Sequence, residues 1–316
     1  MMKGALYDQL WIHRQMLQDR VRCEAYRRAI ADTVKTGDVV LDMGTGTGIL
    51  SLFAARAGAR KVYAIERTSI VDLARRLVRI NRAEEQIEIL QGDMENMDLP
   101  EQVDVIISEW MGPYGVDENL LPSVLIARDR WLKPGGKMLP ERVTAWMAPA
   151  WDSELAREMS FFQARPYDLD LSLITRYTAQ EVWYAQHHIS LEHLLAEPQP
   201  MWTTNVCECS LEEARGPFQA LLSFSITHPG KLNALAAWFS AELGAGHLLT
   251  CAPDAPKTHW GRTVCPLDRA LEVAPGTDIA VEFACEPGEP GWSNTRWSVR
   301  IGEGDWEHHD QERALI

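Results

Sequence analysis

Two glutamates that stand nine residues apart, Glu109 and Glu118, are the side chains in this sequence with the clearest potential for chemistry. Residues 104–108 are apolar enough to form a short strand, which places Glu109 at the carboxyl end of that strand. A loop punctuated by glycine and proline then leads to Glu118, ahead of a segment with helical spacing at 119–131. Ligands of open α/β sheets bind at the carboxyl ends of the strands, so the loop could bring both carboxylates to one pocket.

Facing carboxylates suit three tasks. They can share a proton, ligate a hard metal ion, or hold a planar cation such as guanidinium by paired hydrogen bonds. The alternative is that one glutamate caps a helix and the other is solvated.

Residues 37–49 have the pattern of a buried strand, a glycine loop and the start of a helix. Gly44, Gly46 and Gly48 would allow the backbone to approach a ligand closely. A dinucleotide fingerprint reads Gly-x-Gly-x-x-Gly, whereas this loop reads Gly-x-Gly-x-Gly with Asp42 two residues ahead. That register is characteristic of S-adenosylmethionine sites, in which the loop contacts an amino acid and a ribose.

Acidic residues at the ends of the next two predicted strands complete an adenosine site. Glu66 ends the strand predicted at 61–66, and its carboxylate could accept hydrogen bonds from both ribose hydroxyls. Asp93 and Glu95 follow the strand predicted at 87–90, and either could bind the exocyclic amine of adenine. The loop and these acids together predict S-adenosylmethionine as the cofactor.

The order of the elements predicts the fold. Strands and helices alternate over residues 31–141, which predicts a doubly wound, Rossmann-like methyltransferase sheet that binds the cofactor. Two short helical patterns occupy residues 1–30, ahead of this sheet. Residues 142–316 carry short β-type runs separated by turns, which predict an antiparallel sandwich or barrel. A segment of helical character at about 152–196 interrupts this second domain. Its helices are expected at 152–165, 179–187 and 190–196.

Composition is typical of a soluble globular protein of about two domains, since the 316 residues are 46% apolar and 24% charged. Apolar runs are far shorter than the ~20 residues that span a bilayer, and no signal peptide is recognisable. We therefore expect no membrane partner and a cytoplasmic location. Six cysteines without a Cys-x-x-Cys pair predict neither a metal site nor a disulfide framework.

The negative charge is unevenly distributed. Residues 1–150 carry 20 Lys and Arg against 21 Asp and Glu, whereas residues 151–316 carry 11 against 24. An acidic half would repel a phosphate backbone, so no nucleic-acid partner is expected. It would attract basic peptides, and the alternative is that the acidity only maintains solubility.

Three sequence blocks resemble one family. Ser-Glu-Trp-Met-Gly at 108–112, followed by Asp-Glu-Asn-Leu-Leu at 117–121, resembles the double-glutamate hairpin of the protein arginine N-methyltransferases. Thr-His-Trp at 258–260 is similar to a second hallmark, and the residues from Tyr7 to Tyr26 resemble the helical lid of that family. The resemblance implies S-adenosylmethionine-dependent methylation of arginine guanidino groups in proteins or peptides. It also implies a homodimer formed through the helical arm at about 152–196.

The resemblance assigns catalytic roles to four residues. Glu109 and Glu118 would grip the substrate guanidinium for in-line methyl transfer. His259, which the family pairs with a carboxylate that matches Asp19, is a candidate to take the released proton, as is Glu118.

Further residues would shape the substrate slot and the cofactor site. Met16 and Trp260 would wall the slot, and Arg22 would hold the cofactor carboxylate, a task that suits the guanidinium fork. The implied cofactor contacts are His13, Arg22, Asp42, Gly44, Thr45, Gly46, Gly48, Glu66, Asp93, Met94, Glu95 and Glu109.

Departures from the family pattern leave the substrate open. Pro113 and Asp117 stand where the family usually has tyrosines, so the slot loses two aromatic hydroxyls and gains a negative charge. Most members also carry a further N-terminal helix, and the six residues before Tyr7 predict that it is short or missing. Two alternatives therefore stand beside protein arginine methylation. One is a methyltransferase of a small guanidino or amino metabolite, and the other is a cofactor-binding interaction module without activity.

Overall fold

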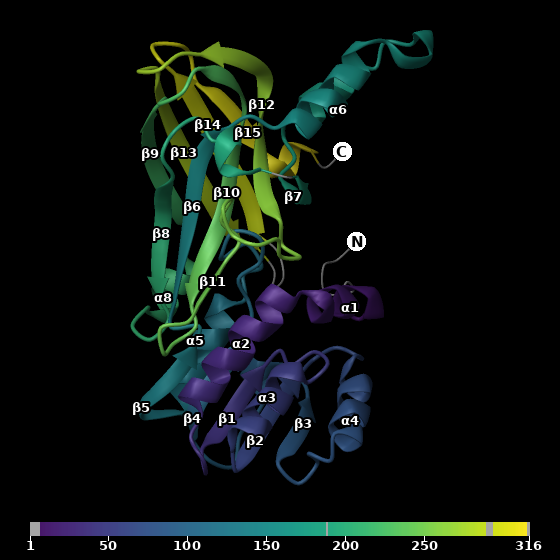
Figure 1. The fold of residues 1–316 in the computed structure, drawn as a ribbon, viewed down its shortest axis with the longest axis vertical. Coiled ribbons are helices and arrows are strands. Elements are labelled where there is room, and N and C mark those ends of the chain that lie inside the picture. Colours follow the sequence, from purple (N-terminus) through teal and green to yellow (C-terminus); the bar gives the residue numbers. More distant parts are fainter. Residues whose placement is uncertain (1–6, 188, 289–292, 315–316) are drawn as a thin grey trace.

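In the computed structural model, which describes residues 7–187, 189–288 and 293–314, a parallel sheet with its helices lies at one end of an elongated antiparallel part (Figure 1). The expected short segment ahead of Tyr7 lies outside the described residues. No helix in the described part of the chain is both long and apolar enough to cross a membrane.

Five parallel strands form the first sheet. They are β1 Val39–Met43, β2 Lys61–Glu66, β3 Ile87–Gln91, β4 Val103–Ser108 and β5 Leu132–Leu139, in the spatial order β3-β2-β1-β4-β5. The central strand, β1, is buried along its whole length, as expected of a parallel strand covered on both faces. The order changes direction between β1 and β4, and doubly wound sheets open a ligand crevice at such a point. The predicted Rossmann-like sheet is confirmed.

The helices of this part connect the strands and cover the crevice. The connecting helices are α3 Ile49–Ala57, α4 Val71–Ile80, the 3-10 turn η2 Met94–Asn96, and α5 Leu121–Trp131. The lid consists of α1 Leu10–Gln18 and α2 Arg20–Thr33, and Figure 1 shows α1 between the parallel sheet and the antiparallel part. Asp19 separates the two lid helices, because its Oδ1 caps α2 by accepting a hydrogen bond from the backbone N–H of Arg22 at 2.9 Å.

Two antiparallel sheets make up the remainder. Their strands are β6 Arg142–Ala150, β7 Trp183–His187, β8 Gln199–Asn205, β9 Phe218–Ser225, β10 Gly230–Glu242, β11 Leu248–Thr250, β12 Arg262–Val273, β13 Asp278–Pro287, β14 Ser293–Ile301 and β15 Glu307–Asp310. One sheet runs β7-β12-β10-β6-β8 with β11 added to β10, and the other runs β15-β14-β13-β9. Burial alternates along β9, so one face of that strand packs on the core and the other meets solvent. The predicted antiparallel arrangement is confirmed. Short helices accompany it at α8 Leu211–Arg215 and η5 Gln311–Ala314.

The segment between β6 and β8 differs from its prediction. A helix, α6 Ser153–Gln163, projects from the molecule (Figure 1) and is followed by η3 Pro166–Asp168 and α7 Leu173–Thr178. The helix predicted at 179–187 is wrong, because Trp183–His187 form β7 and pair with β12. Aromatic residues such as those at the start of β7 favour strand wherever a sheet edge is open, and β12 offers that edge. The helix predicted at 190–196 is also wrong, since it is only the single turn η4 Leu191–His193, closed by a capping box.

Tyr114 fastens the loop between β4 and α5 to the antiparallel part. Its side chain is fully buried, with the hydroxyl 2.6 Å from Thr295 Oγ1 and 3.4 Å from Cys285 Sγ. The ring packs edge-on against Phe283, with ring centroids 5.8 Å apart. The loop that carries both candidate glutamates is therefore tied to β13 and β14.

Replacing Tyr114 by Phe should lower the free energy of unfolding by about 1–2 kcal/mol, because Thr295 loses its hydroxyl partner inside the core. Denaturant titration followed by tryptophan fluorescence measures the change. Tyr177→Phe, at a side chain that is 37% exposed on α7, is the matched control and should unfold like the wild type. Equal stability of the Tyr114 variant and the wild type would contradict the anchoring role.

Candidate active site

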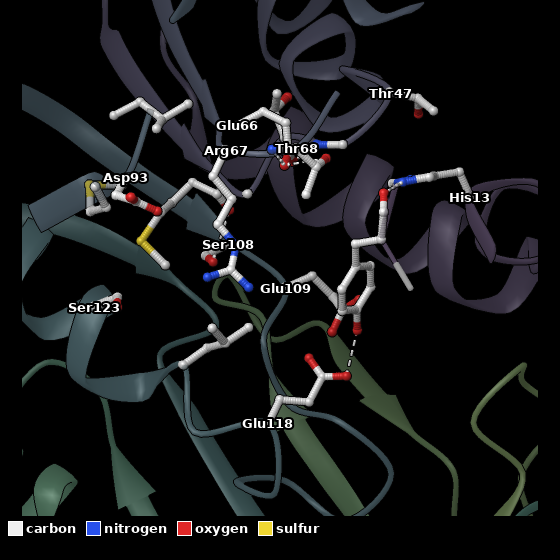
Figure 2. A pocket seen from close by; sticks show the side chains of 18 of the residues that line it. His13, Thr47, Glu66, Arg67, Thr68, Asp93, Ser108, Glu109, Glu118 and Ser123 are labelled. Carbon is white, nitrogen blue, oxygen red and sulfur yellow. Dashed lines mark hydrogen bonds between the residues drawn. The ribbon is translucent and has the colours of Figure 1, made fainter. Parts of the chain in front are cut away.

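A cavity of about 470 Å³ opens at the carboxyl ends of the parallel strands, against the lid (Figure 2). Its walls come from the glycine loop after β1, the segments after β2 and β3, the loop after β4, and the lid. The predicted site residues that line it are His13, Met16, Arg22, Gly44, Thr45, Gly46, Glu66, Asp93, Met94, Glu95, Glu109 and Glu118. Segments that are far apart in the sequence thus meet around one space.

Glu66 is fixed at the edge of this cavity by three hydrogen bonds. Its Oε2 accepts from the backbone N–H of Gly46 at 2.9 Å, and its Oε1 accepts from the N–H and hydroxyl of Thr68 at 2.8 and 2.7 Å. A carboxylate offers about four acceptor sites, so one remains free, and rotation of the Thr68 hydroxyl would release a second. Two acceptor sites on a fixed carboxylate suit the adjacent hydroxyls of a ribose.

The glycine loop leaves room for a ligand close to the backbone. Gly44 has a φ of +69°, and the position where its Cβ would stand has no atom within 4 Å. At Gly46, with a φ of +55°, a Cβ would lie 3.2 Å from the ring of His13. The lid therefore approaches the loop only because residue 46 is glycine. The open space beside Gly44 and the fixed Glu66 carboxylate fit the amino-acid and ribose parts of S-adenosylmethionine.

Two of the predicted cofactor residues support this loop from behind. Asp42 is fully buried, and its Oδ2 accepts hydrogen bonds from the hydroxyls of Thr45 and Ser51 at 2.6 Å each. Burial raises the pKa of Asp42. Gly48 begins α3 in the left-handed conformation, with a φ of +82°. Asp42 and Gly48 thus hold the shape of the loop, while Gly44, Thr45 and Gly46 face the cavity.

The two candidates for an adenine contact both lie at the cavity. Asp93 and Glu95 flank the buried Met94 on the turn after β3. Ser123, at the start of α5, donates a short hydrogen bond to Glu95 Oε1, and Arg130 donates to the Glu95 carbonyl at 3.0 Å. Both carboxylates are exposed, and Glu95 is oriented by α5.

Glu109 already holds a guanidinium group. The Nε and Nη2 of Arg22 donate to Glu109 Oε2 at 3.2 and 3.1 Å, and the two side chains are 7% and 11% exposed. Burial alone would lower the pKa of Arg22, but the charge of Glu109, the hydrogen bond to it and the nearby Tyr26 and Cys23 together outweigh burial, so the pKa is raised. The pair joins the lid helix α2 to the end of β4.

Glu118 faces the same space from the other end of the loop. The hydroxyl of Tyr7 donates to Glu118 Oε1 at 2.6 Å, and Figure 2 shows this bond beside Glu109. Burial, reinforced by the charge of Glu118, raises the pKa of Tyr7 well above its ordinary value. Tyr7 thus stays a neutral donor at physiological pH. The lid spacing in the sequence included Tyr7, but nothing local indicated that it would reach Glu118.

Asp19 and His259 form the predicted pair. Asp19 Oδ2 accepts from the backbone N–H of His259 at 2.8 Å and lies 2.8 Å from His259 Nδ1. Burial alone would raise the pKa of Asp19, but the hydrogen bonds from His259 and from the Arg22 backbone outweigh it and lower the pKa. The next residue, Trp260, packs edge-on against Phe239 with ring centroids 5.0 Å apart. The ion pair joins the lid to the segment before β12.

The two hairpin substitutions have a structural consequence. Asp117 is only 2% exposed, and its Oδ1 accepts from the backbone N–H of Tyr114 at 3.2 Å. Gly112 has a φ of +59°, and a Cβ there would lie 2.6 Å from Asp117 Oδ1. The Asp117 side chain therefore stabilises the loop by accepting a hydrogen bond from the backbone of the same loop. With Pro113 in the loop, the tyrosine of this hairpin is Tyr114, and its side chain turns into the antiparallel part.

Several residues that line the cavity were not predicted from the sequence. They are Tyr7, Leu17, Met43, Thr47, Ile49, Ile65, Arg67, Thr68, Gly92, Asn96, Ser108, Leu120 and Ser123. Ser108 and Arg67 adjoin predicted site residues at strand ends, so strand-end position alone could have indicated them. Ser123 and Leu120 depend on where α5 packs, which the local sequence does not specify.

A Rossmann-like sheet with a glycine loop, a ribose-type acid and two carboxylates in one cavity defines a methyltransferase that uses a nucleoside cofactor. Known proteins agree with this class. Residues 141–300 match the arginine methyltransferase oligomerization subdomain, and residues 9–129 match the TRM5/TYW2 methyltransferase domain.

Full-length relatives narrow the class to one family. The chain is 36% identical to protein arginine N-methyltransferase 6 of Danio rerio, over 98% of this chain and 91% of that protein. It is 34% identical to protein arginine N-methyltransferase PRMT10 of Oryza sativa subsp. japonica, over 88% and 81%. The solved Trypanosoma brucei PRMT1 enzyme–prozyme heterotetrameric complex with AdoHcy matches with a TM-score of 0.85 and 31% identity, over 96% and 98%. The chain belongs to the protein arginine N-methyltransferase family, which confirms the family, fold and activity predicted from the sequence.

Asp19→Asn tests the charge of the Asp19–His259 pair. Because the pKa of Asp19 is lowered in the folded protein, its ionised form stabilises the fold above the unfolded pKa of about 4. That stabilisation is lost as the pH falls through the lowered pKa. The wild type should exceed the variant in free energy of unfolding by about 1–3 kcal/mol near neutral pH, and the gap should close in acid. Denaturant titrations across this pH range measure it, and a gap that is the same at every pH would contradict a charge effect.

Proposed function

We propose that this protein methylates arginine side chains of basic protein or peptide substrates, with S-adenosylmethionine as the methyl donor. The single observation that carries the proposal is that Glu109 binds the guanidinium of Arg22 in the cavity that Glu66 and the glycine loop also line. A carboxylate that binds one buried guanidinium is chemically suited to bind another. The solved structure of the related PRMT1 complex contains AdoHcy, the product that S-adenosylmethionine leaves after methyl transfer.

The residues that would hold the cofactor divide between loop, strands and lid. Glu66 would accept the ribose hydroxyls, and Glu95 or Asp93 would accept the exocyclic amine of adenine. Arg22 binds Glu109 through Nε and Nη2, so its Nη1 end is the part that would hold the cofactor carboxylate. When bound, the cofactor supplies a methyl group on a sulfonium, and transfer breaks that carbon–sulfur bond as the carbon–nitrogen bond forms.

Glu109 and Glu118 would prepare the substrate guanidinium. A guanidinium has a pKa above 12 and delocalised lone pairs, so it is a poor nucleophile unless its charge is localised. Two carboxylates that accept its N–H groups would draw positive charge to the bound nitrogens and hold the remaining nitrogen for in-line attack. Positioning of this kind can contribute several kcal/mol to lowering the barrier, roughly 7–11 at the limit. Tyr7 now bonds Glu118 and would have to share that oxygen with the substrate.

Two groups are candidates for the proton released after transfer. Glu118 would already bond the guanidinium, and His259 is oriented by the ionised Asp19. An imidazole is the side chain most often used to accept and release protons in catalysis. Met16, on the cavity wall, and Trp260, packed behind His259, would enclose the slot.

We propose a homodimer formed through the arm at about 152–196. Support comes from the match to an oligomerization subdomain and from the apolar side chains that the arm exposes. These are Phe161, Tyr167, Leu169, Leu173, Ile174, Tyr177 and Leu191. A projecting segment with this many exposed apolar side chains is typical of an interface.

The proposed activity is tested by mass spectrometry of a reaction with S-adenosylmethionine, a Gly/Arg-rich peptide and a pool of small guanidino compounds. We expect methylated peptide arginine and untouched small compounds. Fragmentation would show whether both methyl groups share one nitrogen. A methylated small compound with an unmodified peptide would contradict the proposal. It would indicate that Pro113 and Asp117, which depart from the family pattern, have changed the substrate specificity.

Glu118→Gln tests the two-glutamate mechanism, because it keeps an oxygen for Tyr7 but removes the charge. The turnover number on the peptide should fall by about 100-fold or more. Affinity for S-adenosylhomocysteine, measured by calorimetry, should be unchanged, since Glu66 and the loop are intact. Glu84→Gln, at an exposed carboxylate after α4, is the matched control. Full turnover in the Glu118 variant would refute the mechanism.

Leu173→Glu tests the arm. Leu173 is 58% exposed on α7, and a charge there should turn the dimer into a monomer in sedimentation velocity at micromolar concentration. Leu221→Glu, at a side chain that is 82% exposed on β9, should remain dimeric. A wild-type protein that sediments as a monomer would contradict the proposed assembly.

A further inference from the structure

Arg67 is a cation in the cofactor cavity, and among residues 7–187, 189–288 and 293–314 no acidic side chain pairs with its guanidinium. It follows Glu66 directly at the carboxyl end of β2, lines the cavity and is exposed. Figure 2 shows its side chain reaching into the cavity, with the guanidinium in the view between Asp93 and Glu109. Within the described residues, no ion pair or hydrogen bond holds this guanidinium.

Three of the acidic groups near Arg67, those of Glu66, Glu109 and Asp8, are engaged by other partners. Glu66 accepts from Gly46 and Thr68, and Glu109 binds Arg22. Asp8 is influenced by the charge of Arg67, but its Oδ1 accepts from the N–H and the hydroxyl of Ser69 at 2.8 Å each, and these bonds are the main reason its pKa is lowered. Arg67 is therefore not held in place by a fixed counter-charge, and its long side chain is free to adapt to a ligand.

A guanidinium without a carboxylate partner has another preferred contact. It is planar and weakly hydrated, so it stacks on aromatic faces, which a lysine ammonium does less well. The adenine of the cofactor is a flat ring, and it must lie between the ribose acceptor Glu66 and the amine acceptors Asp93 and Glu95. Arg67 follows Glu66 directly and lines the same cavity as Asp93 and Glu95.

We propose that Arg67 stacks on the adenine and forms a movable cover over the cofactor. This inference rests on the proposed use of S-adenosylmethionine and adds a positioning residue to its site. Stacking acts on the ring, so it contributes equally to binding of S-adenosylmethionine and S-adenosylhomocysteine. A simple charge effect would differ between the two, because Arg67 would repel the sulfonium cation and not the neutral thioether.

The test is calorimetry with three ligands: S-adenosylmethionine, S-adenosylhomocysteine and 5′-methylthioadenosine, which keeps the adenosine and lacks the amino acid. Arg67→Met should weaken all three by a similar factor, about 3–10-fold. Arg67→Lys should recover only part of the loss, because it restores the charge without the plane. Arg76→Met, at an exposed arginine of α4, is the matched control and should bind like the wild type.

The outcomes separate this inference from the proposed function. Wild-type protein that fails to bind S-adenosylhomocysteine would overturn the proposed function itself, whereas binding that is lost in Glu66→Ala supports the cofactor site. With that site established, unchanged affinities in Arg67→Met would overturn the stacking role. Tighter binding of S-adenosylmethionine alone, or full recovery by lysine, would overturn it as well, since both results indicate an effect of charge.

Discussion

The buried ion pair between Arg22 and Glu109 is the interaction on which the site depends. It joins the lid to the end of β4 through two hydrogen bonds, with both side chains almost out of contact with solvent. Loss of one partner from such a pair leaves an uncompensated buried charge and typically costs about 3–5 kcal/mol. The cavity therefore keeps its shape only while α2 and β4 stay together. Because Arg22 stays beside Glu109, the negative charge of this carboxylate is compensated before a substrate binds.

Three further hydrogen-bonded contacts of lid residues also stabilise the position of the lid against the site. Tyr7 bonds Glu118, the ring of His13 bonds the Tyr7 carbonyl at 2.8 Å, and Asp19 pairs with His259. The lid thus contacts both glutamates of the hairpin and the Thr-His-Trp block, which lies about 140 residues further along the chain. A substrate guanidinium would share with Tyr7 the Glu118 oxygen that Tyr7 bonds, whereas Arg22 bonds only Oε2 of Glu109 and leaves Oε1 to face the substrate. Recognition then adds a new cation to carboxylates that are already desolvated and oriented.

The hairpin shows how a loop can change its sequence and keep its glutamates in place. The Asp117 carboxylate accepts a hydrogen bond from the backbone N–H of Tyr114 and lies beside Gly112, which has a left-handed φ. The Tyr114 side chain is buried against β13 and β14. These contacts fix the loop from the side opposite the cavity. The aromatic hydroxyls that the family pattern would lead one to expect are absent from positions 113 and 117, while Glu109 and Glu118 still face one space.

The sequence by itself determined the features whose signals are local. The glycine loop, the acid at the end of β2, the two glutamates and the alternation of strands and helices could all be predicted, because each depends on residue type and short spacing. Tertiary structure decided the rest. Residues 183–187 became a strand because β12 left an edge open, and Asp42 and Gly48 came to support the loop from behind because the buried strand β1 turns there. Tyr7 and Ser123 line the cavity because the lid and α5 pack against it. Such placements depend on how distant segments pack, and no local spacing of residues records that packing.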